Sequence, residues 1–296
     1  MMEKPTLKSS LKSLFYIAPM LLIVGTFNLY PIVQSFLMSL YQDYNIFTGE
    51  VGGYGFSNFV EILQDPKFIL AIRNTFIFVL GVVPISIVIS LTIAVLLTKI
   101  EALSSFFRSI YFLPFVTSTV AISIVWSWIY HSRFGLLNYG LGLLGVAPIE
   151  FLEDPDYAML ALVIMAVWKG LGFNIILFLV GLNNIDANYY SAAKIDGAKG
   201  FQRFTNITVP LLGPTIFLVS VMGVINSFKV FDEVFALFQS RPGPAGSAMT
   251  VVYYIFQKFY QENQYAVAAA AGIVLFLIIL VVTLIQMGFN KKFVHY

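Results

Sequence analysis

The chain has 296 residues, of which 59% are hydrophobic and only 11% are charged, and its mean hydropathy is +0.85. Soluble domains carry about 25% charged residues, so this composition excludes a soluble fold and predicts an integral membrane protein. The net charge of +2 leaves no basic stripe for a nucleic acid, and the absence of cysteine excludes disulfides, thiolate metal sites and cysteine nucleophiles.

Six apolar runs are long enough to cross a bilayer, because a spanning helix needs about 20 apolar residues. The runs are continuously apolar, which favours helices over barrel strands, whose side chains alternate with a period of two. The sequence therefore predicts an all-α polytopic membrane protein with six transmembrane helices in a single domain over residues 1–296. The first to sixth predicted spans are about 14–38, 74–98, 109–130, 157–181, 210–237 and 265–289.

The first span follows a basic start, MMEKPTLKSSLK, of the kind that also begins a signal peptide. The uncharged stretch after it runs for about 30 residues, which is longer than a signal-peptide core. A convincing small-x-small cleavage motif is not apparent either. Both observations favour an uncleaved first span.

Aromatic residues gather near the end of the third span, at Trp126, Trp128 and Tyr130. Tryptophan and tyrosine are enriched at the two membrane–water interfaces. We therefore interpret these three residues as interface aromatics rather than as a ligand-binding platform.

The loop over residues 186–206 is polar and lies between the fourth and fifth spans. Asp186 can cap a short helix, ANYYSAAKI, by accepting a backbone N–H. Gly197 can end that helix because glycine adopts a positive φ. Phe201 and Phe204 are expected to pack onto the membrane bundle. From the residues alone, an ordinary surface connector remains an equally good interpretation.

The lysines and arginines of the connecting segments predict the orientation, because cytoplasmic loops carry an excess of them. With six spans, the richer side includes both termini and the 186–206 loop, so we expect all of these to be cytoplasmic. That side has ten basic residues and the other side has five. The ten are Lys4, Lys8, Lys12, Lys99, Arg108, Lys194, Lys199, Arg203, Lys291 and Lys292, and the five are Lys67, Arg73, Arg133, Arg241 and Lys258.

The stretch YYSAAKIDGAKGFQRFTNITVPLLGP resembles the signature loop of ABC importer permease subunits. Ala192 and Ala193 precede Gly197 at the spacing of that signature, and nine further residues lead to an Ile-Thr-Val-Pro stretch that ends at Pro210. Other segments resemble the carbohydrate-uptake branch of this family, the maltose, lactose, multiple-sugar and glycerol-phosphate type. They are LFYIAPMLLIVGTFNLYPIVQSFLMSL, SNFVEILQDPKFILAIRNTFIF, FRSIYFLPFVTSTVAISIVWSWIY, FKVFDEVFAL and VVYYIFQKFYQENQYAVAAAAGIVLFLI.

The resemblance implies the inner membrane of a prokaryote, a second similar permease, two ATPase subunits and an external solute-binding protein that delivers a sugar. No phosphate-binding loop of the form G-x-x-x-x-G-K-[ST] occurs in the sequence, so ATP and Mg²⁺ are expected in the ATPase subunits and no cofactor is expected in this chain. The short helix of the 186–206 loop would then couple the permease to the ATPase. The coupling residues implied are Tyr190, Ser191, Ala192, Ala193, Lys194, Asp196, Gly197 and Ala198.

Two segments depart from the family pattern. Ser191 stands where the family usually has a glutamate, so a charged contact at this position is not expected. The segment LFQSRPGPAGS replaces the usual Leu-Thr-Gly-Gly-Gly-Pro stretch and adds Arg241.

Polar residues inside the fourth and fifth spans mark a candidate substrate pathway, because charge inside a membrane is costly and usually functional. Asn226, Lys229 and Glu233 have spacings of three and four residues, which predicts one helix face. Lys229 and Glu233 could also simply neutralise each other. A sugar needs hydrogen-bonding groups and an aromatic platform, which WKGLGFN and NSFKVFDEV supply through Trp168, Lys169, Gly170, Phe173, Asn174, Asn226, Lys229, Asp232 and Glu233.

Other functions are less consistent with the sequence. An intramembrane enzyme needs a base or a metal site, but the two histidines, His131 and His295, lie outside the predicted spans. A secondary transporter or channel would work alone, yet no repeat is visible, and Asp232 and Glu233 are the only carboxylates available for ion coupling within the spans. A stand-alone carrier or channel for a small polar solute remains the alternative.

Overall fold

The computed structural model describes the backbone of residues 7–46, 48–98 and 104–293, and it is mostly helical. Three residues named in the sequence analysis lie outside these ranges, namely Lys4, Lys99 and His295. The structure does not describe the side chains of Lys8, Lys12, Arg108, Lys291 and Lys292. The chain divides into two compact units. The small unit comprises residues 1–65 and 255–274, and the large unit comprises residues 66–254 and 275–296.

Among the described residues, four helical segments are long and apolar enough to cross a membrane, namely Leu14–Ser39, Pro66–Leu97, Pro155–Asn183 and Tyr265–Phe289. Two further candidates are pairs of helices with a sharp bend between their members. Ile110–Val116 and Thr119–Ile129 are bent by 113°, and Gly200–Leu211 and Gly213–Phe228 are bent by 65°. The structure therefore has four to six candidate spans.

The large unit holds most of the helices. In chain order it contains α4 (Pro66–Leu97), α5 (Ser104–Val116), α6 (Thr119–Ile129), α7 (Leu136–Leu143), α8 (Pro155–Asn183), α9 (Ala187–Ile195), α10 (Gly200–Arg203), α11 (Val209–Leu211), α12 (Gly213–Phe228) and α13 (Asp232–Leu237). Two more helices, α14 (Val251–Phe256) and α15 (Tyr265–Phe293), cross the boundary between the units.

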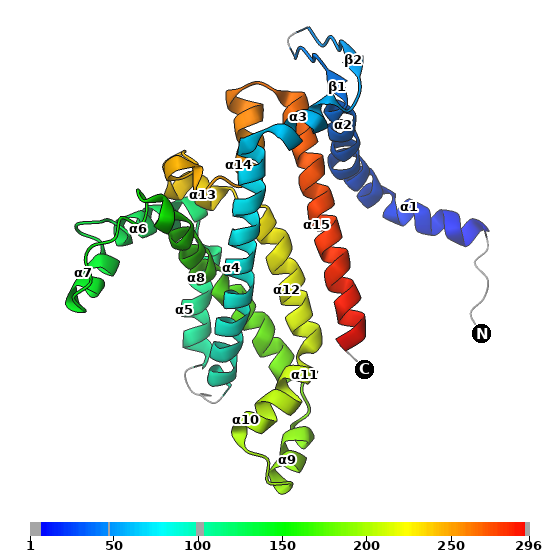
Figure 1. Ribbon diagram of the computed structural model, residues 1–296. Helices are drawn as coiled ribbons and strands as arrows, with labels where there is room; N and C mark the ends of the chain where they lie inside the picture. The colour runs from blue at the N-terminus through cyan, green and yellow to red at the C-terminus, as the bar shows by residue number, and fades with distance from the viewer. Residues whose placement is uncertain (1–6, 47, 99–103, 294–296) are drawn as a thin grey trace. The chain divides into compact units, whose positions relative to one another are not determined.

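The continuous helix α8 is the central element of the large unit, and α4 and α5 both pack against it (Figure 1). Its first turn is capped by Asp154, whose Oδ1 accepts the N–H of Asp156 at 2.9 Å, and Pro155 occupies the first helical position. At 1.5 Å per residue, its 29 residues extend about 43 Å. Helix α8 is thus long enough to cross a bilayer.

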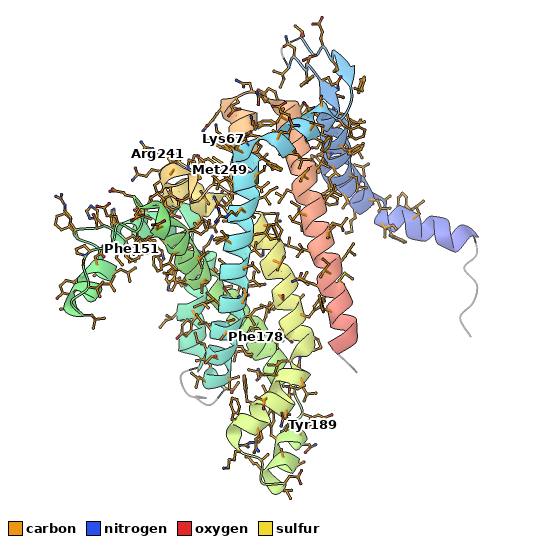
Figure 2. The ribbon with its side chains drawn as sticks, in the orientation of Figure 1. Lys67, Phe151, Phe178, Tyr189, Arg241 and Met249 are labelled. Carbon is orange, nitrogen blue, oxygen red and sulfur yellow. The ribbon has the colours of Figure 1, made fainter. Side chains whose placement is uncertain are left out.

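Small residues let the helices around α8 approach closely. A Cβ atom placed on Gly172 of α8 would lie 2.0 Å from the carbonyl oxygen of Tyr111 in α5. On the other side, a Cβ on Gly81 of α4 would lie 3.1 Å from the Val163 side chain. Close backbone approach at small residues is typical of membrane helix interfaces. Farther along α8, Phe178 is fully buried in a core that it shares with α4 and α12 (Figure 2).

Two of the predicted spans are not single helices. Residues 109–130 form α5 and α6, which are separated at Thr117 and Ser118. Residues 210–237 begin within the short helix α11, continue as α12 and end as α13, with residues 229–231 outside any helix. The other predicted spans match long helices, although the second helix begins at Pro66, eight residues earlier than expected.

The small unit contains α1 (Leu7–Val24), a π-helical turn (Gly25–Leu29) and α2 (Tyr30–Ser39), then a two-stranded antiparallel hairpin of β1 (Tyr41–Gln42) and β2 (Gly53–Tyr54), and α3 (Ser57–Gln64). The Asn58 side chain donates to the carbonyls of Ser39 and Tyr41 at 2.9 and 2.8 Å. The buried ammonium of Lys258 contacts Glu262 at 2.9 Å and Asp65 at 3.7 Å. Polar side chains therefore fasten the turns of this unit.

Candidate functional site

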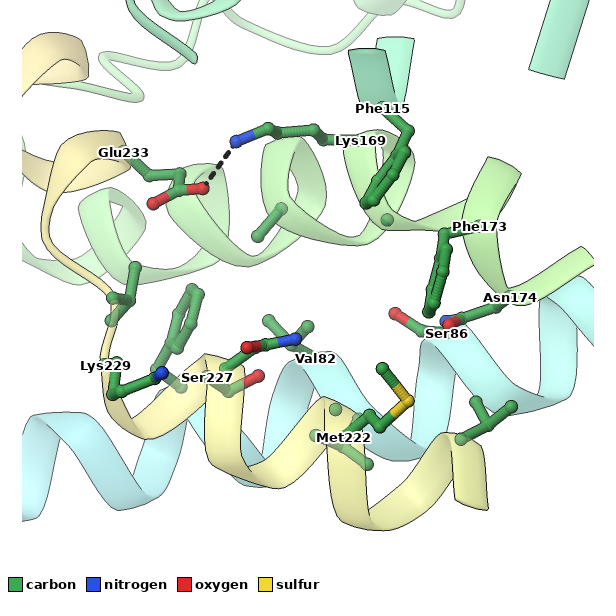
Figure 3. A pocket seen from close by; sticks show the side chains of 18 of the residues that line it. Val82, Ser86, Phe115, Lys169, Phe173, Asn174, Met222, Ser227, Lys229 and Glu233 are labelled. Atoms are coloured by element: carbon green, nitrogen blue, oxygen red, sulfur yellow. Dashed lines mark hydrogen bonds and ion pairs between the residues drawn. The ribbon is translucent and has the colours of Figure 1, made fainter. Parts of the chain in front are cut away.

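A cavity of about 410 Å³ lies within the large unit, and we call it the Lys169 cavity (Figure 3). Helices α4, α5, α8 and α12 and the segment 229–233 contribute to its walls. Its polar and charged lining residues are Ser86, Lys169, Asn174, Asn226, Ser227, Lys229, Asp232 and Glu233. Eight of the nine residues predicted for the substrate pathway line this cavity, including Gly170 and Phe173.

Trp168 is the predicted pathway residue that does not line the cavity. It lies beside Trp126 of α6, with ring centroids 5.5 Å apart in an edge-to-face arrangement. The aromatic wall of the cavity comes instead from Phe173 and Phe115, whose rings stack at 5.0 Å (Figure 3). Phe115 was missed because it lies in the third span, which was not considered as part of the substrate pathway.

Residues 229–231 break the helix next to the cavity. Helix α12 ends at Phe228 with Lys229 as its C-cap, and α13 begins at Asp232. The prediction that Asn226, Lys229 and Glu233 share one helix face is therefore wrong for Glu233, which belongs to a different helix. The break widens the polar wall, because it places both Lys229 and Asp232 at the cavity surface.

Glu233 forms an ion pair with Lys169 of α8, at 2.8 Å between Nζ and Oε1 (Figure 3). The alternative that Lys229 and Glu233 simply neutralise each other is thus wrong, since Glu233 pairs with Lys169. The two paired side chains are only 17% and 19% exposed, and the Lys169 ammonium also donates to Thr119 Oγ1 at 2.5 Å. A charge in this position requires such partners, because removing one partner of a buried pair costs on the order of 3–5 kcal/mol.

Lys169 contacts the residues that follow two of the helix breaks in the large unit. Thr119 is the first residue of α6, directly after the break that separates it from α5. Glu233 lies in the first turn of α13, directly after the break at residues 229–231. One side chain of the unbroken helix α8 therefore holds the starts of two half-helices.

Two further charges at the cavity surface are exposed, those of Lys229 and Asp232. Within the described part of the chain, neither side chain forms an ion pair. The amides of Asn174 and Asn226 and the hydroxyls of Ser86 and Ser227 add neutral donors and acceptors. Such a wall can hydrogen-bond a hydroxyl-rich solute, while Phe115 and Phe173 can cover an apolar face of it.

The serines of the cavity were also missed by the sequence reasoning. Ser86 lies in the second span, two residues after Pro84, and Ser227 lies beside Asn226. A hydroxyl in an apolar helix can hydrogen-bond a carbonyl of its own helix, as Ser90 does with Ser86. Serines alone therefore give a weak signal of a polar pathway.

The 186–206 loop folds locally as predicted. Helix α9 covers Ala187–Ile195, and Asp186 Oδ1 accepts the N–H of Asn188 at 2.9 Å. Gly197 has φ = 76°, a left-handed conformation that ends the helix. The N–H of Ala198 donates to the carbonyl of Ala193 at 2.9 Å and completes the turn.

A side-chain contact attaches helix α9 to the fifth-span region. The hydroxyls of Tyr190 and Thr208 lie 3.0 Å apart, which joins α9 to the π-helical turn of residues 204–208. Phe204 packs into the core of the large unit as expected, whereas Phe201 is 77% exposed, so the prediction for Phe201 is wrong.

The residues implied for coupling are mostly exposed on α9 and its turn. Ser191 donates to the carbonyl of Ala187 at 3.1 Å, so its hydroxyl serves its own helix. The large side chains of Tyr189 and Ile195 are exposed on the same loop, and Figure 2 shows the position of Tyr189. This loop follows the end of α8, about 43 Å from the start of that helix.

The aromatic residues at the end of α6 are not equivalent. Tyr130 is buried, and its hydroxyl donates to the carbonyl of Ala161 at 2.8 Å. Trp126 packs between Tyr130 and Trp168. The interpretation of all three residues as interface aromatics is therefore wrong for Tyr130 and Trp126, and only Trp128 is largely exposed.

Comparison with known proteins decides the family. A family model described as "Binding-protein-dependent transport system inner membrane component" matches residues 68–295, which include both the Lys169 cavity and α9. The chain belongs to this family. The resemblance inferred from the signature loop is confirmed, and the protein is a permease component of the inner membrane.

Two relatives align with this permease over nearly its whole length. The lactose transport system permease protein LacF of Rhizobium radiobacter is 34% identical over 291 residues, which cover 95% of this chain and 96% of that protein. The arabinooligosaccharides transport system permease protein AraP of Bacillus subtilis is 34% identical over 280 residues, which cover 94% and 88%.

A solved structure confirms the fold. The crystal structure of a bacterial ABC transporter involved in the import of the acidic polysaccharide alginate matches this permease with a TM-score of 0.84. The match covers 98% of this chain and 99% of that chain at 23% sequence identity. This permease therefore has the fold of an ABC transporter permease.

Proposed function

We propose that this permease is the transmembrane subunit of an ATP-driven ABC importer, and that it passes a sugar or oligosaccharide across the membrane by alternating access. The observation that carries the proposal is the Lys169 cavity, a polar chamber whose walls include α4 and α8, two helices long enough to span a bilayer. Polar and charged groups at such a depth mark a solute pathway. The chain belongs to a family of binding-protein-dependent transport systems, and we infer import because an external binding protein delivers the solute to the permease.

The sugar class rests on the relatives and on the cavity wall. Relatives carry names that refer to lactose, arabinooligosaccharides and trehalose or maltose. Within the Lys169 cavity, the amides, hydroxyls and charged side chains can hydrogen-bond sugar hydroxyls, and the Phe115–Phe173 pair can cover the C–H face of a ring. Trp168 has no part in this proposal, because it points to Trp126.

For the topology, we propose six spans in a single transmembrane domain with both termini in the cytoplasm. In this arrangement each bent pair of helices crosses the membrane as one span. The excess of lysine and arginine on one side supports the orientation. Helix α8 also supports it, because its length separates the residue 131–154 region from the 186–206 loop by a bilayer thickness.

For the coupling, we propose that α9 and its turn contact an ATPase subunit. The residues involved would be Tyr190, Ser191, Ala192, Ala193, Lys194, Asp196, Gly197 and Ala198. A helix whose exposed face carries Ala192 beside Tyr189 and Ile195 can approach a partner closely and bury apolar area. Since Ser191 bonds within its own helix, the contact would depend on shape and burial more than on charge.

The partners proposed are a second, similar permease, two ATPase subunits that bind ATP and Mg²⁺, and an external sugar-binding protein. ATP hydrolysis then takes place outside this chain.

Co-expression with the neighbouring transport genes and purification through a tag on this permease tests the proposal. We expect a complex with two ATPase subunits and ATP-dependent sugar uptake in proteoliposomes when the loaded binding protein is present. Sugar uptake by this chain alone, without ATP, would instead identify a secondary carrier.

A further inference from the structure

A second concave site lies within the large unit, at the other ends of the two half-helices that Lys169 holds. We call it the Trp128 cleft. Its volume is about 730 Å³. Its walls come from the end of α6, from residues 150–153 before α8, and from residues 237–245 after α13. The side chains of Trp128, Glu150, Glu153, Gln239 and Arg241 line the cleft.

The polar side chains of the cleft are available to a ligand. Glu150, Glu153, Gln239 and Arg241 are all exposed. Although the glutamates and the arginine have opposite charges and share one cleft, they form no ion pair among the residues that the structure describes. Planar carboxylate, amide and guanidinium groups can each bind two neighbouring hydroxyl groups at once.

Trp128 gives the cleft an apolar platform, since its side chain is 71% exposed. An aromatic face presented to water beside hydrogen-bonding groups can cover the C–H face of a sugar ring. The combination of one exposed indole with several bidentate polar groups fits a carbohydrate better than an apolar ligand. A cleft of about 730 Å³ also falls within the range of volumes of small-molecule sites.

The segment that leads to Glu150 is fixed by one buried side chain, that of Asn138. The amide of Asn138 donates to the carbonyl of Ile149 and accepts from its N–H, both at 2.9 Å. It also donates to the carbonyl of Ser132 at 3.2 Å. These bonds hold the segment that carries Glu150 in one position.

The opposite wall is fixed although its backbone is strained. Gln239, Ser240 and Ala245 have φ values of 53°, 63° and 51°, each of which costs roughly 1–3 kcal/mol outside glycine. The Tyr253 hydroxyl donates to the carbonyl of Ser240 at 2.7 Å, and burial raises the pKa of this phenol. The Asn74 amide likewise donates to the carbonyl of Gly246 at 3.0 Å. These two hydrogen bonds help to hold the strained wall in its conformation.

The cleft and the Lys169 cavity lie at opposite ends of the same two helices. Helix α6 begins at Thr119, which contacts Lys169, and has Trp128 near its end. Helix α13 begins at the cavity and ends at Leu237 in the cleft, and its six residues extend about 9 Å. Along α13, the cleft and the cavity are therefore separated by about the length of one short helix.

We propose that the Trp128 cleft is a carbohydrate subsite, which receives the sugar before it enters the Lys169 cavity. This proposal rests on the proposed function of sugar import. Trp128 would cover a ring face, while Glu153, Gln239 and Arg241 would bind the hydroxyls. In the proposed topology, the cleft lies on the side of the membrane from which the sugar arrives.

The test measures sugar binding to the complete complex in nanodiscs without the binding protein. Ligand-observed NMR with lactose, maltose, trehalose and an arabinan oligosaccharide reports contacts at both sites. We expect Trp128→Ala to weaken binding of the preferred sugar at least fivefold and to raise the KM of uptake. Trp128→Phe should keep the wild-type affinity for the sugar and the wild-type KM. Glu153→Gln provides a second variant that keeps side-chain size. The control is Tyr139→Ala, which removes an exposed aromatic side chain of α7 outside the cleft.

Unchanged sugar binding in the Trp128→Ala and Glu153→Gln variants, or an equal loss in Tyr139→Ala, would overturn the proposal. A lower affinity for the sugar-free binding protein, with sugar binding unchanged, would also overturn it and would identify a protein-docking surface. The proposed function fails separately, when the wild-type complex takes up no sugar at all. Uptake that depends on Asn226 but not on Trp128 would leave the proposed function standing and remove only this subsite.

Discussion

Lys169 is the residue on which the geometry of the cavity depends most directly. Its ammonium contacts Glu233 of α13 and Thr119 of α6. Because the ion pair is largely buried, each charge compensates the desolvation of the other. Loss of one partner should therefore do more damage than loss of both.

We expect Lys169→Met and Glu233→Met, each alone, to lower the thermal stability of the purified complex by an amount equivalent to about 3 kcal/mol, since a charge is then buried without its partner. The double variant Lys169→Met/Glu233→Met should recover most of this loss, and its sugar uptake shows whether the charges are also needed for transport. Differential scanning calorimetry of the four proteins completes the cycle. Additive losses in the double variant would show that the pair is not a unit.

Asn226 tests the proposed sugar pathway more directly, since it lines the cavity and is exposed there. We expect Asn226→Ala to raise the KM of uptake about tenfold, because a sugar hydroxyl left without its partner costs about 1–3 kcal/mol. Leu218→Ala is the matched control, since Leu218 is an exposed residue of α12 that does not line the cavity. Equal kinetics in both variants would remove Asn226 from the pathway.

At the scale of the elements, α9 depends on its terminal turn. Gly197 has φ = 76°, and a Cβ atom there would meet no other atom within 4 Å. A substitution would thus act through the backbone conformation and not through a clash. Asparagine tolerates this conformation, whereas a β-branched residue does not.

We therefore expect Gly197→Val to reduce sugar uptake and sugar-stimulated ATP hydrolysis together by tenfold or more, while the complex still reaches the membrane. Gly197→Asn should retain most of both activities. Uptake assays and ATPase assays on the same proteoliposomes make this comparison. Wild-type transport by the valine variant would contradict a coupling role for the turn.

The elements also show how far the sequence predicts the structure. The apolar runs at 157–181 and 265–289 correspond to α8 and α15 within a few residues, because in lipid a helix bonds its backbone groups within its own segment. The breaks at Ser118 and at residues 229–231 were not predicted. Hydropathy averages over a window and does not register a bend, which depends on the contacts that satisfy the freed backbone groups.

The same limit applies to the site. Polar residues in the fourth and fifth spans predicted the lining of the cavity, because polarity stands out in an apolar run. The partner of Glu233 was not predictable, because Lys169 lies 64 positions away and becomes its neighbour only through the break before α13. Spacing along one helix favoured Lys229 instead.

At the scale of the whole molecule, the absence of cysteine makes the proposed topology accessible to a direct experiment. Single cysteines at Glu153 and Lys199 lie on segments at opposite ends of α8, and both side chains are exposed. A membrane-impermeant maleimide should label Glu153→Cys in intact spheroplasts, and Lys199→Cys only after permeabilisation.

The unmodified protein is the control, since it offers no thiol to the reagent. Labelling of both positions from the outside, or the reverse pattern, would refute the proposed orientation.

The helix break at residues 229–231 has a consequence for how such permeases change their specificity. Lys229, Val230 and Phe231 all line the cavity, yet none of them lies within a helix. Replacing Lys229, which is exposed, therefore alters the chemistry of the wall without removing a helical hydrogen bond or opening a gap between α4 and α8. Substrate range can diverge at this position at little cost to insertion and folding, so new specificities should arise at the break before they arise in the long helices.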